Sequence, residues 1–170
     1  MQVITIAYPK VDKSENILEH ITQENVDISG LDPIAQFWKG PARVRYQVFV
    51  IEQEIPAENE IDEQDAESIH VVLMDENNVP VSTARVFAYG PSCKLGRMAT
   101  LKTSRGKGHG RKVVEVVEKI ARETLKADQI LIHAQKAQSG FYASLGFDLD
   151  TSAGEWLEEG IIHVKMSKKL

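Results

Sequence analysis

Three glycines alternate with basic residues in one short segment of this chain. The segment, called the glycine loop below, covers residues 105–112 and reads Arg-Gly-Lys-Gly-His-Gly-Arg-Lys. Because Gly106, Gly108 and Gly110 carry no side chains, the backbone can approach a ligand closely, and the free N–H groups of a following helix would point at an anion. The basic side chains also run against a formal net charge of -5 for the whole chain. The pattern predicts a site for a phosphate or pyrophosphate group.

Two better-known phosphate loops do not fit this segment. A Walker loop needs a hydroxyl residue after its last glycine and lysine to hold magnesium, but Gly110 is followed by Arg111 and Lys112. The dinucleotide fingerprint needs a third glycine where this chain has Arg111 or Val113. Neither a nucleoside triphosphatase nor a nicotinamide enzyme is therefore expected.

Segments on both sides of the glycine loop extend the pattern. Upstream, residues 95–100 read Leu-Gly-Arg-Met-Ala-Thr, and downstream the chain has Gln135-x-x-Gln138-x-x-Phe141-Tyr142-x-x-x-Gly146-Phe147. Together with the loop, these resemble the acetyl-CoA site of the GNAT-superfamily N-acetyltransferases, although that family usually has Asn in place of Gln135. Residues 45–53 and 159–166 resemble the ElaA-like branch of the superfamily. The resemblance covers roughly residues 43 to 166.

The resemblance implies acetyl-CoA as co-substrate, with no metal. It implies that the strand at 98–100 pairs with the pantetheine arm and that one of its N–H groups polarises the thioester carbonyl. The hydroxyl of Tyr142 would lie near the CoA sulfur and protonate the departing thiolate; the alternative is a core tyrosine with a satisfied hydroxyl. The cofactor-binding residues that the resemblance implies are Met98, Ala99, Thr100, Arg105, Gly106, Lys107, Gly108, His109, Gly110, Arg111, Gln135 and Tyr142.

The general base is not defined by the sequence. Many family members carry a glutamate on the central strand, where this chain has Gly96, Arg97 and Met98. A carboxylate or histidine elsewhere could accept the proton directly or through water, although lone histidines on strands are more often structural. The candidates are Glu60, His70 and His163, with His70 placed first.

An acidic run lies between Glu52 and Glu67. It contains Glu52, Glu54, Glu58, Glu60, Asp62, Glu63, Asp65 and Glu67. Such a run is usually a solvated loop, but in the GNAT architecture this region walls the acceptor site, where carboxylates would favour a cationic amine. Polyamine-like, aminosugar and lysine acceptors all remain open. Nucleic acid is not an expected partner, because the basic residues cluster at one loop and form no stripe.

Two classes of function follow from these motifs. The first is an acetyl-CoA-dependent N-acetyltransferase acting on a primary amine of a small molecule or peptide, and the alternative is a non-catalytic module that binds or senses acyl-CoA. One cysteine, Cys93, excludes an internal disulfide and suits a cytoplasmic protein. No apolar run of about 18 residues and no signal-peptide pattern are present, so no membrane association is expected. A homodimer is left open.

Length and periodicity predict one mixed α+β domain over residues 1–170, with a poorly matched segment at 1–36 and a core at 43–166. The sheet is expected to be mainly antiparallel and flanked by helices, and the resemblance implies a splayed central strand pair. Within the poorly matched segment, Ser14 could cap a helix. The expected strands are 2–7, 68–75, 79–89, 93–100, 130–134 and 161–166, and the expected helices are 41–53, 109–125 and 138–145.

Overall fold

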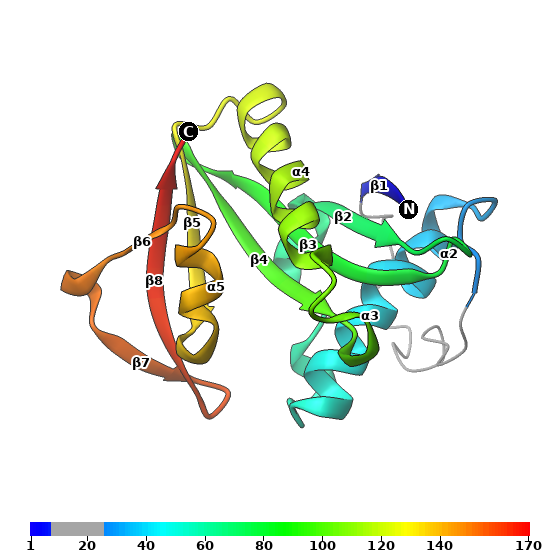
Figure 1. Cartoon of the computed structure of the whole chain (residues 1–170), viewed down its shortest axis with the longest axis horizontal. Coiled ribbons are helices and arrows are strands. Elements are labelled where there is room, and N and C mark those ends of the chain that lie inside the picture. Colours follow the sequence, from blue (N-terminus) through cyan, green and yellow to red (C-terminus); the bar gives the residue numbers. More distant parts are fainter. Residues whose placement is uncertain (8–25) are drawn as a thin grey trace. The chain divides into compact units, whose positions relative to one another are not determined.

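The computed structural model describes residues 1–7 and 26–170, and their strands form one sheet in the order β1-β2-β3-β4-β5-β8-β6, with β7 paired to β8 (Figure 1). The strands are β1 (Gln2–Ala7), β2 (Ile69–Met74), β3 (Pro80–Tyr89), β4 (Ser92–Thr100), β5 (Gln129–Gln135), β6 (Asp148–Leu149), β7 (Glu155–Glu158) and β8 (Ile161–Lys169). β4 and β5 are parallel, whereas β1–β2, β5–β8, β6–β8 and β7–β8 are antiparallel. The predicted α+β class with a mainly antiparallel sheet is confirmed.

The chain forms two compact units that interleave in sequence. The first comprises the described residues of Met1–Arg85 together with Arg97–Val116, and the second comprises Val86–Gly96 and Val117–Leu170. A single domain over the whole chain stays a prediction. No helix in the described part of the chain is long and apolar enough to cross a membrane.

In the first unit, a helical stretch lies between β1 and β2 in the chain. It consists of α2 (Pro33–Phe37), a π-helical turn η1 (Trp38–Ala42), α3 (Arg43–Arg45) and a second π-helical turn η2 (Tyr46–Glu52). The predicted start at Pro41 is wrong: the side chain of Asp32 accepts from the N–H groups of Ile34 and Ala35, and Pro33 occupies the first turn, where its missing N–H costs nothing. Pro41 lies inside the stretch, in a π-helical turn. The helix proposed at Ser14 lies outside the described residues.

The core of the first unit forms between this helical stretch and the first two strands. Phe37 and Trp38 pack with residues of β1 and β2, and the buried cluster is Ile6, Ile28, Phe37, Trp38, Ala42, Val72 and Met74. Farther along the chain lie three short 3-10 turns: η3 (Ala57–Asn59) and η4 (Glu63–Glu67) before β2, and η5 (Lys102–Ser104) after β4. The glycine loop comes next, and α4 (His109–Glu123) begins where the sequence predicts it.

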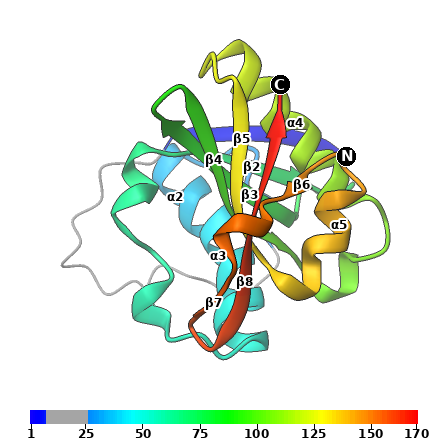
Figure 2. The same ribbon diagram turned by 90° about the vertical axis from the view of Figure 1, so that its left-hand side faces the viewer.

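In the second unit, β5 and β8 lie side by side and α5 (Ser139–Ala143) lies beside β8 (Figures 1 and 2). The parallel pairing of β4 with β5 covers only Cys93–Leu95 and Ile130–Ile132. On its other side β5 pairs with β8 along its whole length, from Gln129 opposite Lys169 to Gln135 opposite His163, so β5 continues beyond its pairing with β4. The predicted splay of the central pair is thus confirmed. The short strands β6 and β7 were not predicted, because their exposed and largely polar residues carry little periodic signal.

Candidate active site

The glycine loop has the backbone that an anion site requires. Gly106 and Gly108 adopt φ values of +74° and +79°, in the left-handed region that favours glycine. Within the described residues, the backbone N–H groups of Gly106, Lys107 and Gly108 have no hydrogen-bond partner, and α4 starts directly after them. Unsatisfied N–H groups at the start of a long helix attract negative charge. The loop therefore fits a phosphate group.

The side chain of Arg105 binds a carboxylate and is therefore less available to bind phosphate. Its Nη1 and Nη2 lie 2.6 and 2.7 Å from the two carboxylate oxygens of Glu52, and its Nε donates to the carbonyl of Thr100 at 3.0 Å. Hydrogen bonding from Arg105 lowers the pKa of Glu52, so the pair stays ionised. This geometry favours a role for Arg105 in fixing the start of the loop to the end of β4. Phosphate binding by its side chain stays a prediction.

A cavity of about 260 Å³ opens beside the loop, within the first unit. Lys107, Gly108, His109 and Lys112 line one part of it, and Met1, Val3 and Leu73 line the other. His109 is buried, and its Nδ1 has no hydrogen-bond partner in the part of the chain that the structure describes. The loop thus combines exposed backbone donors, basic side chains and space for a ligand.

The acidic run is not a uniformly solvated wall. Arg45, which is buried, donates to Glu60 at 2.5 Å and to Asp65 at 2.7 Å. Arg85 binds Asp62 at 2.6 Å, and Glu60 and Asp65 are 3% and 0% exposed. Within the described part of the chain, the exposed carboxylates of the run that form no ion pair are Glu54, Glu58 and Glu67.

Asp62 and Asp65 are held ionised by the arginines around them. Burial alone would raise the pKa of Asp65, but Arg45 and Arg85 outweigh burial and lower it below the ordinary value. The same balance, with Arg85 as partner, lowers the pKa of Asp62. Removing one partner of such a buried pair strongly destabilises the protein, because the remaining charge is left uncompensated. We therefore interpret Glu60 as structural, and its role as general base stays a prediction that this environment does not favour.

His70 lies at the inner edge of the same network. Its ring is 0% exposed and packs edge-on against Phe37 at 5.0 Å, and Nε2 lies 3.2 Å from the carbonyl oxygen of Asp65. A carbonyl can only accept, so Nε2 carries the proton. Burial, followed by the charge of Arg45, lowers the pKa of His70 to about 4. His70 is thus a neutral ring without solvent access, which supports a structural role; catalysis by it is untested.

The buried His70 predicts a pH-dependent stability. The pKa is lower in the folded protein, so the unfolded chain binds more protons between pH 6.5 and 4 and stability falls as the pH drops through this window. The loss should approach roughly 3 kcal/mol. Urea unfolding across this range should show the slope for the wild type, a smaller change for His133→Gln, whose pKa is lowered by partial burial, and a much flatter profile for His70→Gln. An equal slope in all three proteins would contradict the assignment.

Tyr142 is buried in the second unit. The side chain is 6% exposed, and its ring packs edge-on against Phe141 at 5.0 Å and Phe147 at 5.7 Å. In the described part of the chain, no residue hydrogen-bonds to the hydroxyl, although a buried tyrosine usually finds a partner. Burial raises the pKa of the phenol above its ordinary value of 10, so the group stays protonated near neutral pH. It can therefore donate a proton.

His163 lies in the same unit, directly opposite Gln135 on the neighbouring strand. Its Nδ1 lies 2.9 Å from the carbonyl oxygen of Ile161, so Nδ1 must carry the hydrogen and Nε2 keeps its lone pair when the ring is neutral. Trp156 stacks on the ring, with centroids 6.2 Å apart and an angle of 26° between the planes. The ring is thus oriented from two sides, with one nitrogen able to accept a proton.

Sequence reasoning missed the three arginines of the network. Arg45, Arg85 and Arg97 each lie among apolar residues of a helix or strand, and each binds a carboxylate of the acidic run. A buried arginine is rarely tolerated unless it is paired. A charged residue within an apolar segment, combined with a nearby excess of carboxylates, could have indicated these buried ion pairs.

The model of the acetyltransferase (GNAT) domain family matches residues 18–170. The chain belongs to the GNAT acetyltransferase family. The uncharacterized N-acetyltransferase YjcF of Bacillus subtilis is 38% identical over 125 residues, which cover 74% of this chain and 87% of YjcF. Family membership makes the protein an acetyltransferase, and it argues against a binding module without turnover.

Solved structures agree with this GNAT fold. Escherichia coli ElaA superposes with a TM-score of 0.68 at 23% identity, over 86% of this chain and 98% of ElaA. An aminoglycoside 6'-N-acetyltransferase complexed with coenzyme A superposes with a TM-score of 0.58 at 13% identity, over 85% of this chain and 95% of that chain. Another protein with this fold, the aminoglycoside 6'-N-acetyltransferase, therefore binds coenzyme A.

Proposed function

We propose that this GNAT protein transfers the acetyl group of acetyl-CoA to a primary amine of a small molecule or peptide. The observation that carries the proposal is the set of N–H groups at Gly106, Lys107 and Gly108 that have no partner among residues 1–7 and 26–170, placed just before α4 in a protein of net charge -5. These donors suit the pyrophosphate of CoA, and Lys107 and Arg111 add positive charge beside them.

The proposed roles divide between backbone and side chains. A backbone N–H of the strand Met98–Thr100 polarises the thioester carbonyl, Tyr142 is the general acid, and Gln135 contacts the cofactor. For the general base we favour His163 over His70 and Glu60, because its Nε2 keeps a lone pair and its ring is half-buried, whereas the other two side chains are fully buried.

The chemistry balances with these groups alone. The acceptor ammonium gives a proton to His163 Nε2, and the neutral amine nitrogen attacks the carbonyl carbon of the thioester. A C–N bond forms, the C–S bond breaks, and the leaving thiolate takes the proton of the Tyr142 hydroxyl. The attacking nitrogen loses its second proton through solvent to the Tyr142 phenolate, and the His163 imidazolium releases its proton to solvent, so one proton is released for each amide formed. No oxidant, reductant or metal takes part in this sequence.

We propose a cationic acceptor, supported by fewer carboxylates than the acidic run contains. Glu60, Asp62 and Asp65 are neutralised by arginines, so only the exposed carboxylates of the acidic run can attract a positive charge. Glu54 and Glu58 are exposed and lie near one another in sequence. Their field would raise the local concentration of a cationic amine and would weaken as salt increases.

Turnover tests the proposed function directly. Purified protein should release free thiol from acetyl-CoA when a panel of primary amines is supplied, including polyamines, aminosugars and lysine peptides. Mass spectrometry of the acceptor should show one added acetyl group. Release of thiol without an acetylated amine, or no release with any amine, would contradict it.

The glycine loop gives a binding prediction that does not depend on the acceptor. CoA should raise the melting temperature, because a ligand that binds only the folded state stabilises it. Gly108→Asp should abolish this shift by placing a negative charge where the pyrophosphate is proposed to lie. Gly160→Asp is the matched control, since Gly160 has a φ of +75° and, like Gly108, has open space around a new Cβ. Equal shifts in the two variants would place the pyrophosphate elsewhere.

A further inference from the structure

Arg97 has an unusual backbone for a residue inside a strand. Its φ is +48°, although it lies in the middle of β4 and carries a large side chain. Residues other than glycine rarely adopt this region, and they persist there only when the surroundings hold them. A left-handed residue in a strand turns the next peptide plane out of the regular alternation. Here the next plane carries the N–H of Met98.

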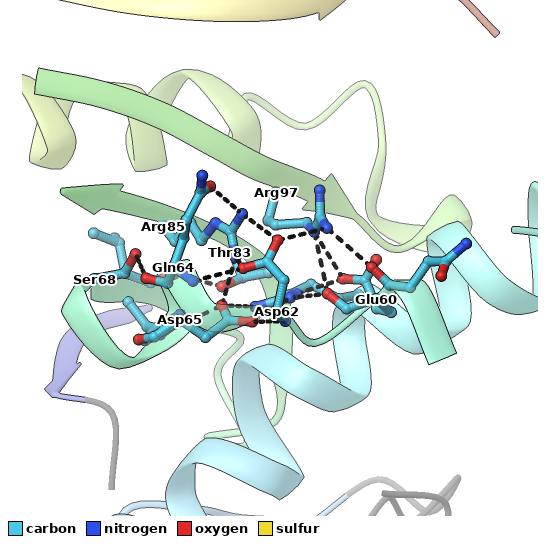
Figure 3. Close-up of polar contacts among 12 residues, drawn as sticks. Glu60, Asp62, Gln64, Asp65, Ser68, Thr83, Arg85 and Arg97 are labelled. Carbon is cyan, nitrogen blue, oxygen red and sulfur yellow. Dashed lines mark hydrogen bonds and ion pairs between the residues drawn. The ribbon is translucent and has the colours of Figure 1, made fainter. Parts of the chain in front are cut away.

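The surroundings that hold Arg97 are contacts of its own side chain (Figure 3). Nη2 donates to Asp62 Oδ2 at 3.0 Å and to the carbonyl of Asn59 at 3.2 Å, and Nε donates to the carbonyl of Glu60 at 3.2 Å. All three acceptors belong to one short segment, residues 59–62. A planar guanidinium that meets three acceptors has a fixed orientation.

The segment that receives Arg97 is itself anchored. Asp62 binds Arg85 through both carboxylate oxygens, at 2.6 and 2.8 Å, and Glu60 binds the buried Arg45. Asp62 also forms a reciprocal capping box with Asp65. The guanidinium of Arg97 is thus fixed to a rigid support, and each carboxylate that it touches has another arginine as partner.

We infer that Arg97 is a positioning residue for acetyl transfer, whose side chain holds the left-handed turn of β4 that aims the Met98 N–H at the thioester carbonyl oxygen. The inference rests on the proposed function, in which this strand polarises the carbonyl. A hydrogen-bond donor aimed at developing charge contributes through its geometry, so a strand free to return to regular alternation loses the contribution. Arg97 thereby has a task different from that of the glutamate which related enzymes carry on this strand.

Arg97→Gly separates this task from folding. Glycine accepts the left-handed φ, and Glu60 and Asp62 keep Arg45 and Arg85, so the melting temperature should stay within a few degrees of the wild type. The turnover number should fall by about tenfold or more, with the KM for acetyl-CoA changed less, because one oriented donor typically contributes on the order of 10²-fold. Millimolar guanidinium should restore part of the turnover, and the same concentration of urea should not.

Lys126→Gly is the matched control. Lys126 is exposed and has a φ of +53°, so its replacement makes the same backbone change without touching the network, and turnover should be unaltered. If Arg97→Gly fails to fold, Arg97→Lys keeps the charge, loses the fork, and should show the same fall in turnover. A folded variant with wild-type turnover, or a change in KM alone, overturns the inference. Wild-type protein without turnover on any amine would instead overturn the proposed function.

Discussion

Tyr142→Phe should lower the turnover number by at least about 10²-fold, because general acid catalysis typically contributes on the order of 10²-fold to 10⁴-fold. The thiolate is then left to depart unassisted or to take its proton from water. The hydroxyl has no partner among the described residues, so its removal should cost less than about 1 kcal/mol of stability. The thermal shift produced by CoA should also survive. The measurement is kcat with both substrates saturating.

Tyr89→Phe provides the control for this experiment. Tyr89 is 52% exposed and its ring contacts Lys94, so the substitution deletes a hydroxyl without opening the core. Its kcat should match that of the wild type. The comparison requires that chemistry be rate-limiting, which a pre-steady-state burst measurement establishes. If Tyr142→Phe then turns over within a factor of about three of the wild type, Tyr142 is a packing residue and not the acid.

The parts of the fold that the sequence predicted are those with local causes. The glycine loop depends on φ values that glycine favours, and α4 shows its apolar positions at helical spacing, so both can be read from consecutive residues. The start of the first helix was misplaced because Asp32-Pro33 and Pro41 both resemble helix starts. The side-chain cap at Asp32 decides between them, and only the structure shows it.

The parts that the sequence did not predict depend on distant partners. An acidic run can be solvated or buried, and the outcome for Glu60 and Asp65 depends on Arg45, which lies 15 and 20 residues away. The same holds for the base: from residue type and position alone, His70 was placed ahead of Glu60 and His163. Burial of the first two, and the hydrogen bond that sets the tautomer of the third, now favour His163.

His163→Ala should lower kcat/KM for the amine by about 10²-fold or more at neutral pH, because the acceptor ammonium then loses its proton only to water. Exogenous imidazole should restore part of the rate in a concentration-dependent manner, since it can occupy the space left by the ring and accept the proton. Acetyl-CoA binding, followed by thermal shift, should be little changed. A purely structural histidine would not be rescued in this way.

His133→Ala is the control that separates base catalysis from packing. His133 packs edge-on against Trp156 at 4.9 Å, while His163 stacks on the same indole, so both variants loosen Trp156. Of these two histidines, only His163 has its tautomer set by a backbone carbonyl of the described residues, and only His163 lies opposite Gln135. If catalysis needs the lone pair on Nε2 of His163, only His163→Ala is slow and only His163→Ala responds to imidazole. Equal losses in the two variants, with no rescue of either, would show that Trp156 packing is what both histidines supply.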